Sequence, residues 1–122
     1  MAHILIIDDS PTDVRVFTTL LEKHSHRVSS AASAEDGIAL AKRERPDLVI
    51  MDVIMPGMNG FQATRMLSRD TDTSAIPILI VTTKSMETDR VWGMRQGAKA
   101  YVTKPVNEGE LMDMIGKLLP AA

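Results

Sequence analysis

The sequence predicts an α/β fold in which five parallel strands form one sheet and helices cover both of its faces. Short apolar runs alternate along the whole chain with segments of helical periodicity. Apolar runs of this kind are typical of parallel strands that are buried on both faces. Right-handed crossovers then place helices on each side of the sheet, which gives a three-layer, doubly wound (βα)5 unit. The alternation alone does not fix the order of the strands.

Five apolar runs are expected to be the strands. The clearest is Leu48-Val49-Ile50-Met51, which is apolar throughout and is followed by Asp52 in the last strand position. A loop rich in Pro and Gly then turns the chain back. The expected strands cover residues 3–8, 27–31 (the weakest), 48–52, 78–82 and 100–103.

The segments between the strands carry the signals that begin and end helices. Ser10 is a good N-cap, Pro11 suits the first helical position, and Asp13 is the acid three residues after the cap, so a helix is expected from here to about residue 24. Ser33 caps the second helix, which ends before Pro46 because the proline ring disfavours helix in the preceding residue.

Three further helices are expected. They cover about residues 61–68, about residues 86–96 with Gly97 as the C-cap, and a last segment that begins with a capping box of Asn107 and Glu110.

Length and composition limit the functions that the chain can have. Its 122 residues have the size of one domain, residues 1–122. A formal charge of −2 and an aromatic content of 3% argue against nucleic acid as a partner. The absence of cysteine excludes disulfides and thiolate catalysis. No apolar run is long enough for a membrane span and the N-terminus does not resemble a signal peptide, so we expect a cytoplasmic protein.

Polar side chains follow four of the expected strands at their carboxyl ends. Asp8 and Asp9 follow the first strand, Asp52 the third, Thr82 the fourth and Lys104 the fifth. In an open α/β sheet, ligands bind outside these ends. We therefore expect three carboxylates, one hydroxyl and one ammonium to meet at one edge of the sheet.

This set of groups is suited to phosphoryl transfer. Adjacent carboxylates repel one another unless a cation neutralises them, and Mg²⁺ prefers a few carboxylates together with waters and phosphate oxygens. Asp52 can then attack phosphorus and form an aspartyl phosphate, without a general base because a carboxylate is deprotonated at neutral pH. Lys104 and Thr82 can stabilise the phosphoryl oxygens by charge and hydrogen bonding.

Each residue also has an ordinary structural interpretation. An Asp after a strand is usually a turn or cap residue, and Asp9 could do no more than stabilise the next helix through its dipole. Thr82 could fill the strand, and Lys104 could be a surface lysine. Five such residues at strand ends are nevertheless hard to explain as coincidence.

Together these residues resemble the receiver domain of two-component response regulators. The resemblance covers essentially the whole chain, and it is carried by Ile-Ile-Asp8-Asp9, Met51-Asp52, Met-Pro-Gly-Met-Asn-Gly at 55–60, Thr82 and Lys104-Pro105. It implies a flavodoxin-like sheet with strand order 2-1-3-4-5. It also implies that the chain is a signalling phosphoacceptor rather than an enzyme. Such a phosphoacceptor takes a phosphoryl group from small phosphodonors by itself and loses the group slowly by itself.

The resemblance assigns a role to each site residue. Asp52 would take a phosphoryl group from a histidine kinase. Mg²⁺ would be held by Asp8, Asp9, Asp52 and the backbone carbonyl of Ile54.

The remaining roles concern the phosphoryl contacts and the switch. Thr82 and Lys104 would contact the phosphoryl group, and the Lys104–Pro105 peptide bond would be cis. Tyr101, three residues before the lysine, would be the aromatic switch that moves together with Thr82.

Because nothing follows the last helix, the chain resembles a stand-alone receiver of the chemotaxis type, a monomer or weak dimer that acts by binding another protein. The expected output face is built from the fourth helix, the fifth strand and the fifth helix, and it includes Trp92, Tyr101 and Val106. Trp92 is either partly packed or an exposed anchor. The segment 90–97 is similar to regulators of chemotaxis-like systems that control type IV pilus twitching motility.

Two residues depart from the commonest receiver pattern. Thr83 stands where a small Ala or Gly is usual, and Ile54, two residues after the acceptor, is apolar and cannot orient an attacking water. We therefore expect slow self-hydrolysis of the acyl phosphate.

Alternative functions share parts of this pattern. A phosphatase of the haloacid dehalogenase class also uses an aspartyl phosphate, but its D-x-D motif differs from the adjacent Asp8 and Asp9. A flavin-binding electron carrier shares the fold, but the chain lacks a hydroxyl-rich phosphate loop after the first strand. A phosphate sink and a phosphorylation-independent adaptor on the same fold remain as further alternatives.

Overall fold

The computed structural model describes residues 1–120 of the chain, and it has a single parallel sheet of five strands. The strand order is β2-β1-β3-β4-β5, which confirms the doubly wound, flavodoxin-like fold. The strands are β1 (His3–Ile7), β2 (Arg27–Ala31), β3 (Leu48–Met51), β4 (Ile78–Thr82) and β5 (Ala100–Thr103). The helices are α1 (Pro11–Lys23), α2 (Ala34–Glu44), α3 (Gly60–Arg69), α4 (Glu87–Gln96) and α5 (Glu108–Leu118).

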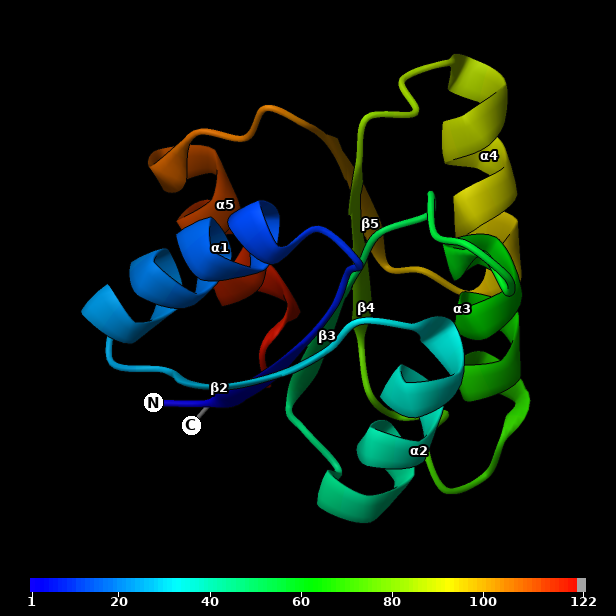
Figure 1. Ribbon diagram of the computed structural model, residues 1–122, viewed down its shortest axis with the longest axis horizontal. Helices are drawn as coiled ribbons and strands as arrows, with labels where there is room; N and C mark the ends of the chain where they lie inside the picture. Colours follow the sequence, from blue (N-terminus) through cyan, green and yellow to red (C-terminus); the bar gives the residue numbers. More distant parts are fainter. Residues whose placement is uncertain (121–122) are drawn as a thin grey trace.

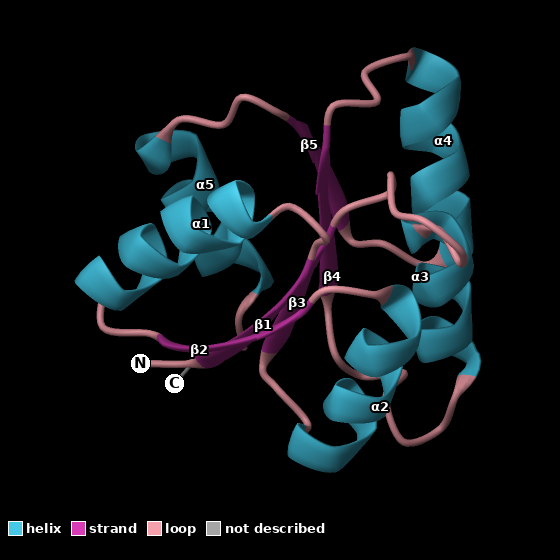
Figure 2. Cartoon of the chain, in the orientation of Figure 1, coloured by secondary structure: helices cyan, strands magenta, loops and turns pink. Residues whose placement is uncertain are grey.

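The helices form a layer on each face of the sheet. Figure 1 shows α1 and α5 on one face and α2, α3 and α4 on the other, and Figure 2 shows the strands as the layer between them. Successive residues of a strand point to opposite faces. An inner strand between two helix layers is therefore apolar on both faces, which explains the apolar runs of β1, β3 and β4, whereas the edge strand β2 is partly polar and partly exposed.

Each face of the sheet has its own apolar cluster. On the α1/α5 side, Ile4, Ile6, Leu48 and Ile50 pack with residues that include Phe17, Leu21, Leu111 and Ile115. On the α2/α3/α4 side, Leu5, Ile7, Val49 and Met51 pack with residues that include Ile38, Phe61 and Leu67. Residues 4–7 and 78–81 are at most 1% exposed. Burial of each such side chain contributes about 1.5–3 kcal/mol, so the central strands form a rigid support for the loops at their ends.

The ends of the elements differ slightly from the sequence prediction. The strands β1 and β3 stop one residue earlier than expected, so Asp8 and Asp52 lie just beyond them. The helix α3 begins at Gly60, one residue before the expected start, and α4 begins at Glu87, one residue after it. In α4, Met86 is the N-cap. Differences of this size are usual at element ends.

The predicted capping box of α5 is only half formed. The Asn107 side chain accepts a hydrogen bond from the N–H of Glu110 at 2.7 Å. Among the hydrogen bonds of residues 1–120, none joins the Glu110 side chain to the N–H of Asn107, and this part of the prediction is wrong. Glu110 is exposed, so water can solvate its carboxylate. The reciprocal box forms instead at α3, between Asn59 and Gln62.

None of the helices within residues 1–120 combines the length and the apolar character that crossing a membrane requires.

Gly60 allows α3 to begin directly against the backbone of Asp52. A Cβ atom on Gly60 would lie 2.1 Å from the carbonyl oxygen of Asp52 and 2.7 Å from the Cα atom of Val53. The N–H of Gly60 also donates to the carbonyl of Val53 at 3.0 Å. The close turn after β3 therefore requires a residue without a side chain.

We predict that Gly60→Ala lowers the free energy of unfolding by about 3 kcal/mol, because the added methyl group forces the backbone after β3 to move. Urea denaturation of the two proteins measures the difference. Gly116→Ala is the matched control, since a Cβ at Gly116 in α5 meets nothing within 4 Å. This control should stabilise the protein by about 0.5–1 kcal/mol through helix propensity, and equal effects of the two substitutions would contradict the packing argument.

Candidate functional site

The register of the sheet brings the acidic residues after β1 and β3 together. Ile7 is paired with Met51, so the next residues, Asp8 and Asp52, leave the sheet side by side. The N–H of Asp52 donates to the carbonyl of Ile7 at 2.9 Å and fixes this arrangement. Asp8 is 3% exposed and Asp52 7% exposed, whereas Asp9 is on the surface.

The ends of β4 and β5 bring Lys104 to the same edge. Thr82 is paired with Thr103, and the N–H of Lys104 donates to the carbonyl of Thr82 at 2.8 Å. The Lys104–Pro105 peptide bond is cis, as the resemblance to receivers implied.

The Lys104 ammonium lies between three carboxylates. Its Nζ atom is 2.9 Å from Oδ2 of Asp8, 3.1 Å from Oδ2 of Asp52 and 2.7 Å from Oδ2 of Asp13. An ammonium has three N–H donors, so each donor is directed to one carboxylate. The side chain of Lys104 is only 11% exposed, and hydrogen bonds between charged groups are stronger than neutral ones.

The surroundings change the proton affinity of two of these groups. Burial raises the pKa of the Asp8 carboxyl above its usual value, and the hydrogen bonds from Ser10 and Lys104 offset only part of this effect. For Lys104, burial alone would lower the pKa, but the hydrogen bonds to Asp13 and Asp8 outweigh it and raise the pKa. Lys104 is therefore firmly charged, and Asp8 is ionised at an energetic cost.

Asp8, Asp9 and Asp52 can hold a metal ion. One carboxylate oxygen of each lies within 4.8 Å of the others. With Asp13, the site contains four carboxylates and the single ammonium of Lys104, so it has an excess of negative charge. Oxygen ligands and excess negative charge fit a hard divalent cation.

The other residues that the sequence singled out lie at or just beyond the ends of β3 and β4. Thr82 is fully buried, and its Oγ1 accepts a hydrogen bond from the N–H of Lys84 at 3.5 Å. The Ile54 N–H donates to Oδ1 of Asp52 at 3.2 Å, while the Ile54 side chain is 53% exposed. Thr83 is exposed beside Thr82.

Tyr101 is turned inward and is 4% exposed. Its hydroxyl donates to the carbonyl of Lys84 at 2.7 Å. Arg90 donates to the Tyr101 carbonyl at 3.1 Å, and its guanidinium lies 5.5 Å from the centre of the ring. Burial, with a smaller contribution from Asp89, raises the pKa of Tyr101 to about 12. The phenol therefore stays protonated and keeps its hydrogen bond to Lys84.

The three residues of the expected output face do not form one exposed patch in this structure. Tyr101 is buried, and Val106 packs against the apolar cluster on the α1/α5 side. Trp92 is 48% exposed and lies on the other side of the sheet, where it lines a hollow of about 450 Å³ together with Ile54 and Phe61.

Asp13 is a site residue that the sequence did not reveal. Its position indicated only an acid in the first turn of α1, which is correct, since its N–H donates to the Ser10 side chain at 3.3 Å. The spacing between Asp13 and Phe17 was the available signal. Residues four apart lie on the same face of a helix, so the face that Phe17 turns toward the core also carries Asp13. Phe17 is buried, and its ring lies 5.9 Å from Nζ of Lys104.

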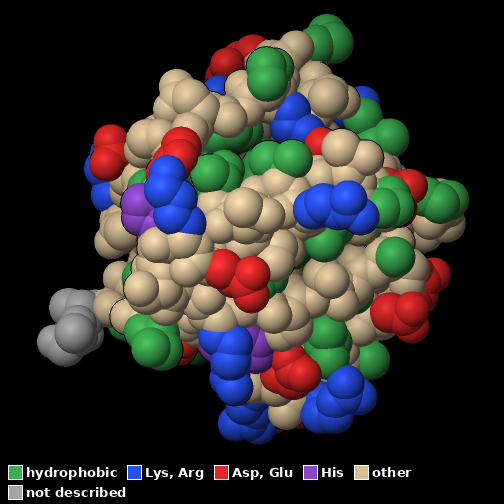
Figure 3. Space-filling model, turned by 60° about the vertical axis from the view of Figure 1, so that its left-hand side comes forward, with side chains coloured by type: hydrophobic (Ala, Val, Ile, Leu, Met, Phe, Trp, Pro, Cys, Tyr) green, Lys and Arg blue, Asp and Glu red, His purple; other side chains and the backbone are tan. Residues whose placement is uncertain are grey.

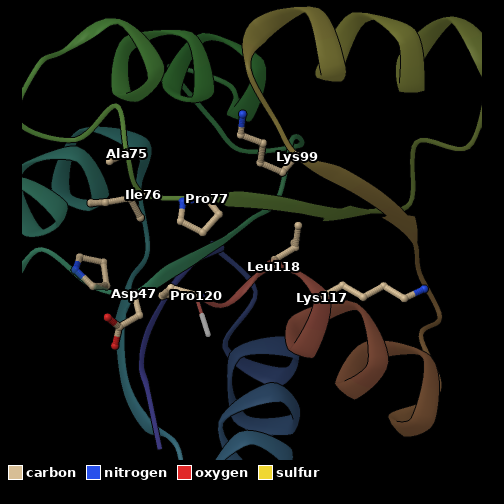
Figure 4. Close-up of a pocket in the computed structure, with 9 residues that line it drawn as sticks. Asp47, Ala75, Ile76, Pro77, Lys99, Lys117, Leu118 and Pro120 are labelled. Atoms are coloured by element: carbon tan, nitrogen blue, oxygen red, sulfur yellow. The ribbon is translucent and has the colours of Figure 1, made fainter. Parts of the chain in front are cut away.

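A second hollow lies at the opposite, amino-terminal edge of the sheet. It has a volume of about 540 Å³ and is lined by residues that include Asp47, Pro77, Lys99 and Lys117. Figure 4 shows the Lys99 and Lys117 side chains pointing in different directions, not toward one common point. The carboxylate edge is therefore the better candidate for the functional site.

Comparisons with known proteins show the family of the chain. The family model described as the response regulator receiver domain matches residues 4–116. The chain is 59% identical over 119 residues to Protein PilH of Pseudomonas aeruginosa, and the match covers 98% of each chain.

Solved structures are similar to this fold over nearly its whole length. The chemotaxis protein CheY4 of Vibrio cholerae is 29% identical, with a TM-score of 0.91 and coverage of 98% of this chain and 99% of that one. The receiver domain of sensor histidine kinase PA1611 from Pseudomonas aeruginosa is 26% identical, with a TM-score of 0.89 and 96% of each chain covered. That structure holds a magnesium ion in its active-site cleft.

We predict that Asp8→Asn stabilises the metal-free protein at pH 7, because it removes a buried carboxylate that is ionised at a cost. A carboxyl whose pKa is raised by folding favours the folded state when protonated. The advantage of Asn is therefore largest at neutral pH, and it shrinks as the pH falls through the raised pKa toward the ordinary value of 3.8.

Urea denaturation with a chelator, at neutral and at acidic pH, measures this difference. Asp36→Asn, an exposed carboxylate at the start of α2, is the control and should change little. A less stable Asp8→Asn protein at pH 7 would show that the Asp8 contacts outweigh its burial.

Proposed function

The chain belongs to the response regulator receiver domain family, and from this we propose that Asp52 accepts a phosphoryl group from a histidine kinase. Receivers carry the signal of a two-component pathway through such a transfer. The observation that supports this assignment is the contact of 3.1 Å between Oδ2 of Asp52 and Nζ of Lys104. It joins a nucleophile to a fixed positive charge at the edge of the sheet where ligands bind.

The side chains around Asp52 act by position and charge. Lys104 reduces the repulsion between the Asp52 carboxylate and an anionic phosphodonor, and after transfer it pairs with a phosphoryl oxygen. The Ile54 N–H holds Oδ1 of Asp52, which fixes the orientation of the carboxylate. Thr82 is the remaining donor. Its hydroxyl would turn from the N–H of Lys84 toward the phosphoryl group.

We assign the metal site to Asp8, Asp9, Asp52 and the backbone carbonyl of Ile54, and the metal to Mg²⁺. The three carboxylates have the spacing and the charge for this ion, and the similar Pseudomonas receiver holds magnesium. Bound Mg²⁺ supplies Lewis-acid stabilisation of phosphoryl oxygens.

Lys84 provides the link from the phosphoryl site to the switch residue. Its N–H donates to Thr82, and its carbonyl accepts from the Tyr101 hydroxyl. Movement of Thr82 toward a phosphoryl oxygen would displace Lys84. Thr82 and Tyr101 would then shift together and remodel the face formed by α4, β5 and α5.

The output is proposed to be contact with another protein in the cytoplasm, by a monomer or weak dimer. Acidic and basic side chains are interspersed on the face shown in Figure 3, which suits a protein partner better than nucleic acid. A role in pilus twitching motility is supported by the resemblance of segment 90–97 and by the identity of 59% to Protein PilH. A phosphate sink is the alternative that shares the same chemistry.

We predict that incubation with magnesium and acetyl phosphate adds one phosphoryl group to the wild-type protein and none to Asp52→Asn, because only Asp52 is the acceptor. Intact-mass spectrometry measures the adduct. Asp36→Asn should be phosphorylated like the wild type. An unmodified wild-type protein would favour the phosphorylation-independent adaptor, and an adduct that persists in Asp52→Asn would place the acceptor elsewhere.

We predict that Ile54→Asn shortens the lifetime of the acyl phosphate about tenfold, because a side-chain amide can orient the attacking water and Ile54 cannot. Decay of the adduct after removal of the phosphodonor measures the lifetime. Met66→Asn, which replaces another half-exposed apolar residue away from the site, is the matched control. Equal lifetimes of wild type and Ile54→Asn would exclude Ile54 as the cause of slow hydrolysis.

A further inference from the structure

We propose that Asp13 is a positioning residue that competes with the phosphoryl group for the Lys104 ammonium. The inference rests on the phosphoacceptor role of Asp52 proposed above. Among the three carboxylates around Lys104, Asp13 makes the shortest contact, with 2.7 Å between its Oδ2 and Nζ of Lys104. The corresponding distances are 2.9 Å for Asp8 and 3.1 Å for Asp52.

The first turn of α1 is built to make this contact. Ser10 caps the helix and accepts from the N–H of Asp13, which fixes the backbone at that position. Phe17 follows one turn later on the same face, and its ring lies below the same ammonium. The helix therefore presents both a carboxylate and an aromatic ring to Lys104.

Lys104 has no N–H left for a new acceptor. Its three donors are directed to Asp8, Asp13 and Asp52, so a phosphoryl oxygen can bind Lys104 only if one of these contacts is broken. The side chain of Asp13 is 39% exposed, compared with 3% for Asp8 and 9% for Asp52. Water can solvate the released carboxylate of Asp13 best, so Asp13 is the residue that gives up the donor.

The transfer step shows what the released donor does. With acetyl phosphate, a carboxylate oxygen of Asp52 forms a bond to phosphorus, and the bond from phosphorus to the acetyl oxygen breaks. Acetate leaves with the electron pair, and no proton is transferred. The phosphoryl group on Asp52 carries more negative charge than the free carboxylate. The N–H that Asp13 releases then donates to a phosphoryl oxygen.

Asp13→Asn tests this competition, because it removes the charge of Asp13 and keeps its size. The half-saturating concentration of acetyl phosphate should fall about threefold, and the affinity for beryllofluoride with Mg²⁺, a stand-in for the phosphoryl group, should rise by about the same factor. Asp36→Asn is the matched control. Asp36 occupies the same position in α2, three residues after the cap Ser33, and its N–H donates to the Ser33 side chain.

A double-mutant cycle shows whether Asp13 acts through Lys104. In a Lys104→Met background, Asp13→Asn should leave the beryllofluoride affinity unchanged, since the group that Asp13 competes for is absent. An increase that persists without Lys104 would overturn the proposal, because Asp13 would then act by repelling the anion directly. A reduced or unchanged affinity of the single variant would overturn it as well.

The wild-type protein separates this inference from the proposed function. If it forms no acyl phosphate and binds no beryllofluoride, the phosphoacceptor role itself fails. If it does both and Asp13→Asn behaves like the wild type, the role of Asp52 stands and the competition by Asp13 is refuted.

Discussion

The contact between the Lys104 ammonium and the carboxylates around it is the interaction on which the rest of this site depends. Asp8 and Asp13 lie on either side of the turn from β1 into α1, Asp52 follows β3, and each places an oxygen within 3.1 Å of the same nitrogen. Carboxylates this close destabilise one another unless a cation lies between them. Lys104 is the cation that the chain itself supplies. Its single positive charge does not neutralise all the carboxylates, and with Asp9 the remaining negative charge can attract a metal ion.

The sheet makes this cluster possible, because its strands hold the charged residues in fixed positions. Parallel pairing of β1 with β3 sets Asp8 beside Asp52, and pairing of β4 with β5 delivers Lys104 to the same edge. The apolar clusters on both faces cannot rearrange without opening the core. A change of charge on Asp52 must therefore be accommodated by the loops, where Lys84 joins Thr82 to Tyr101.

Much of this arrangement could be predicted from the sequence, and the exceptions have physical causes. Asp8, Asp52 and Lys104 were identifiable because strand ends of a parallel sheet meet at one edge. The strand order came from the resemblance to receivers, since the alternation of strands and helices is compatible with several orders. Asp13 was missed because its capping role already explained it, and only the fold shows that the same side chain reaches Lys104.

The inward orientation of Tyr101 could not be predicted either. It depends on a hydrogen bond to the carbonyl of Lys84 and on the position of Arg90, which are contacts between β5 and the segment around α4. Trp92 likewise faces the loop after β3 because of how α4 packs, not because of any local pattern.

The proposed coupling runs from charge added at Asp52, which Lys104 and Thr82 sense, through Lys84 to Tyr101. Backbone amide chemical shifts, recorded by NMR with Mg²⁺ before and after addition of beryllofluoride, test it most directly. We expect changes at Asp8, Asp52 and Lys104 that continue through residues 82–84 to Tyr101, with little change at Asp47 and Lys117 on the opposite edge. Changes confined to the site residues, or centred on the opposite edge, would contradict it.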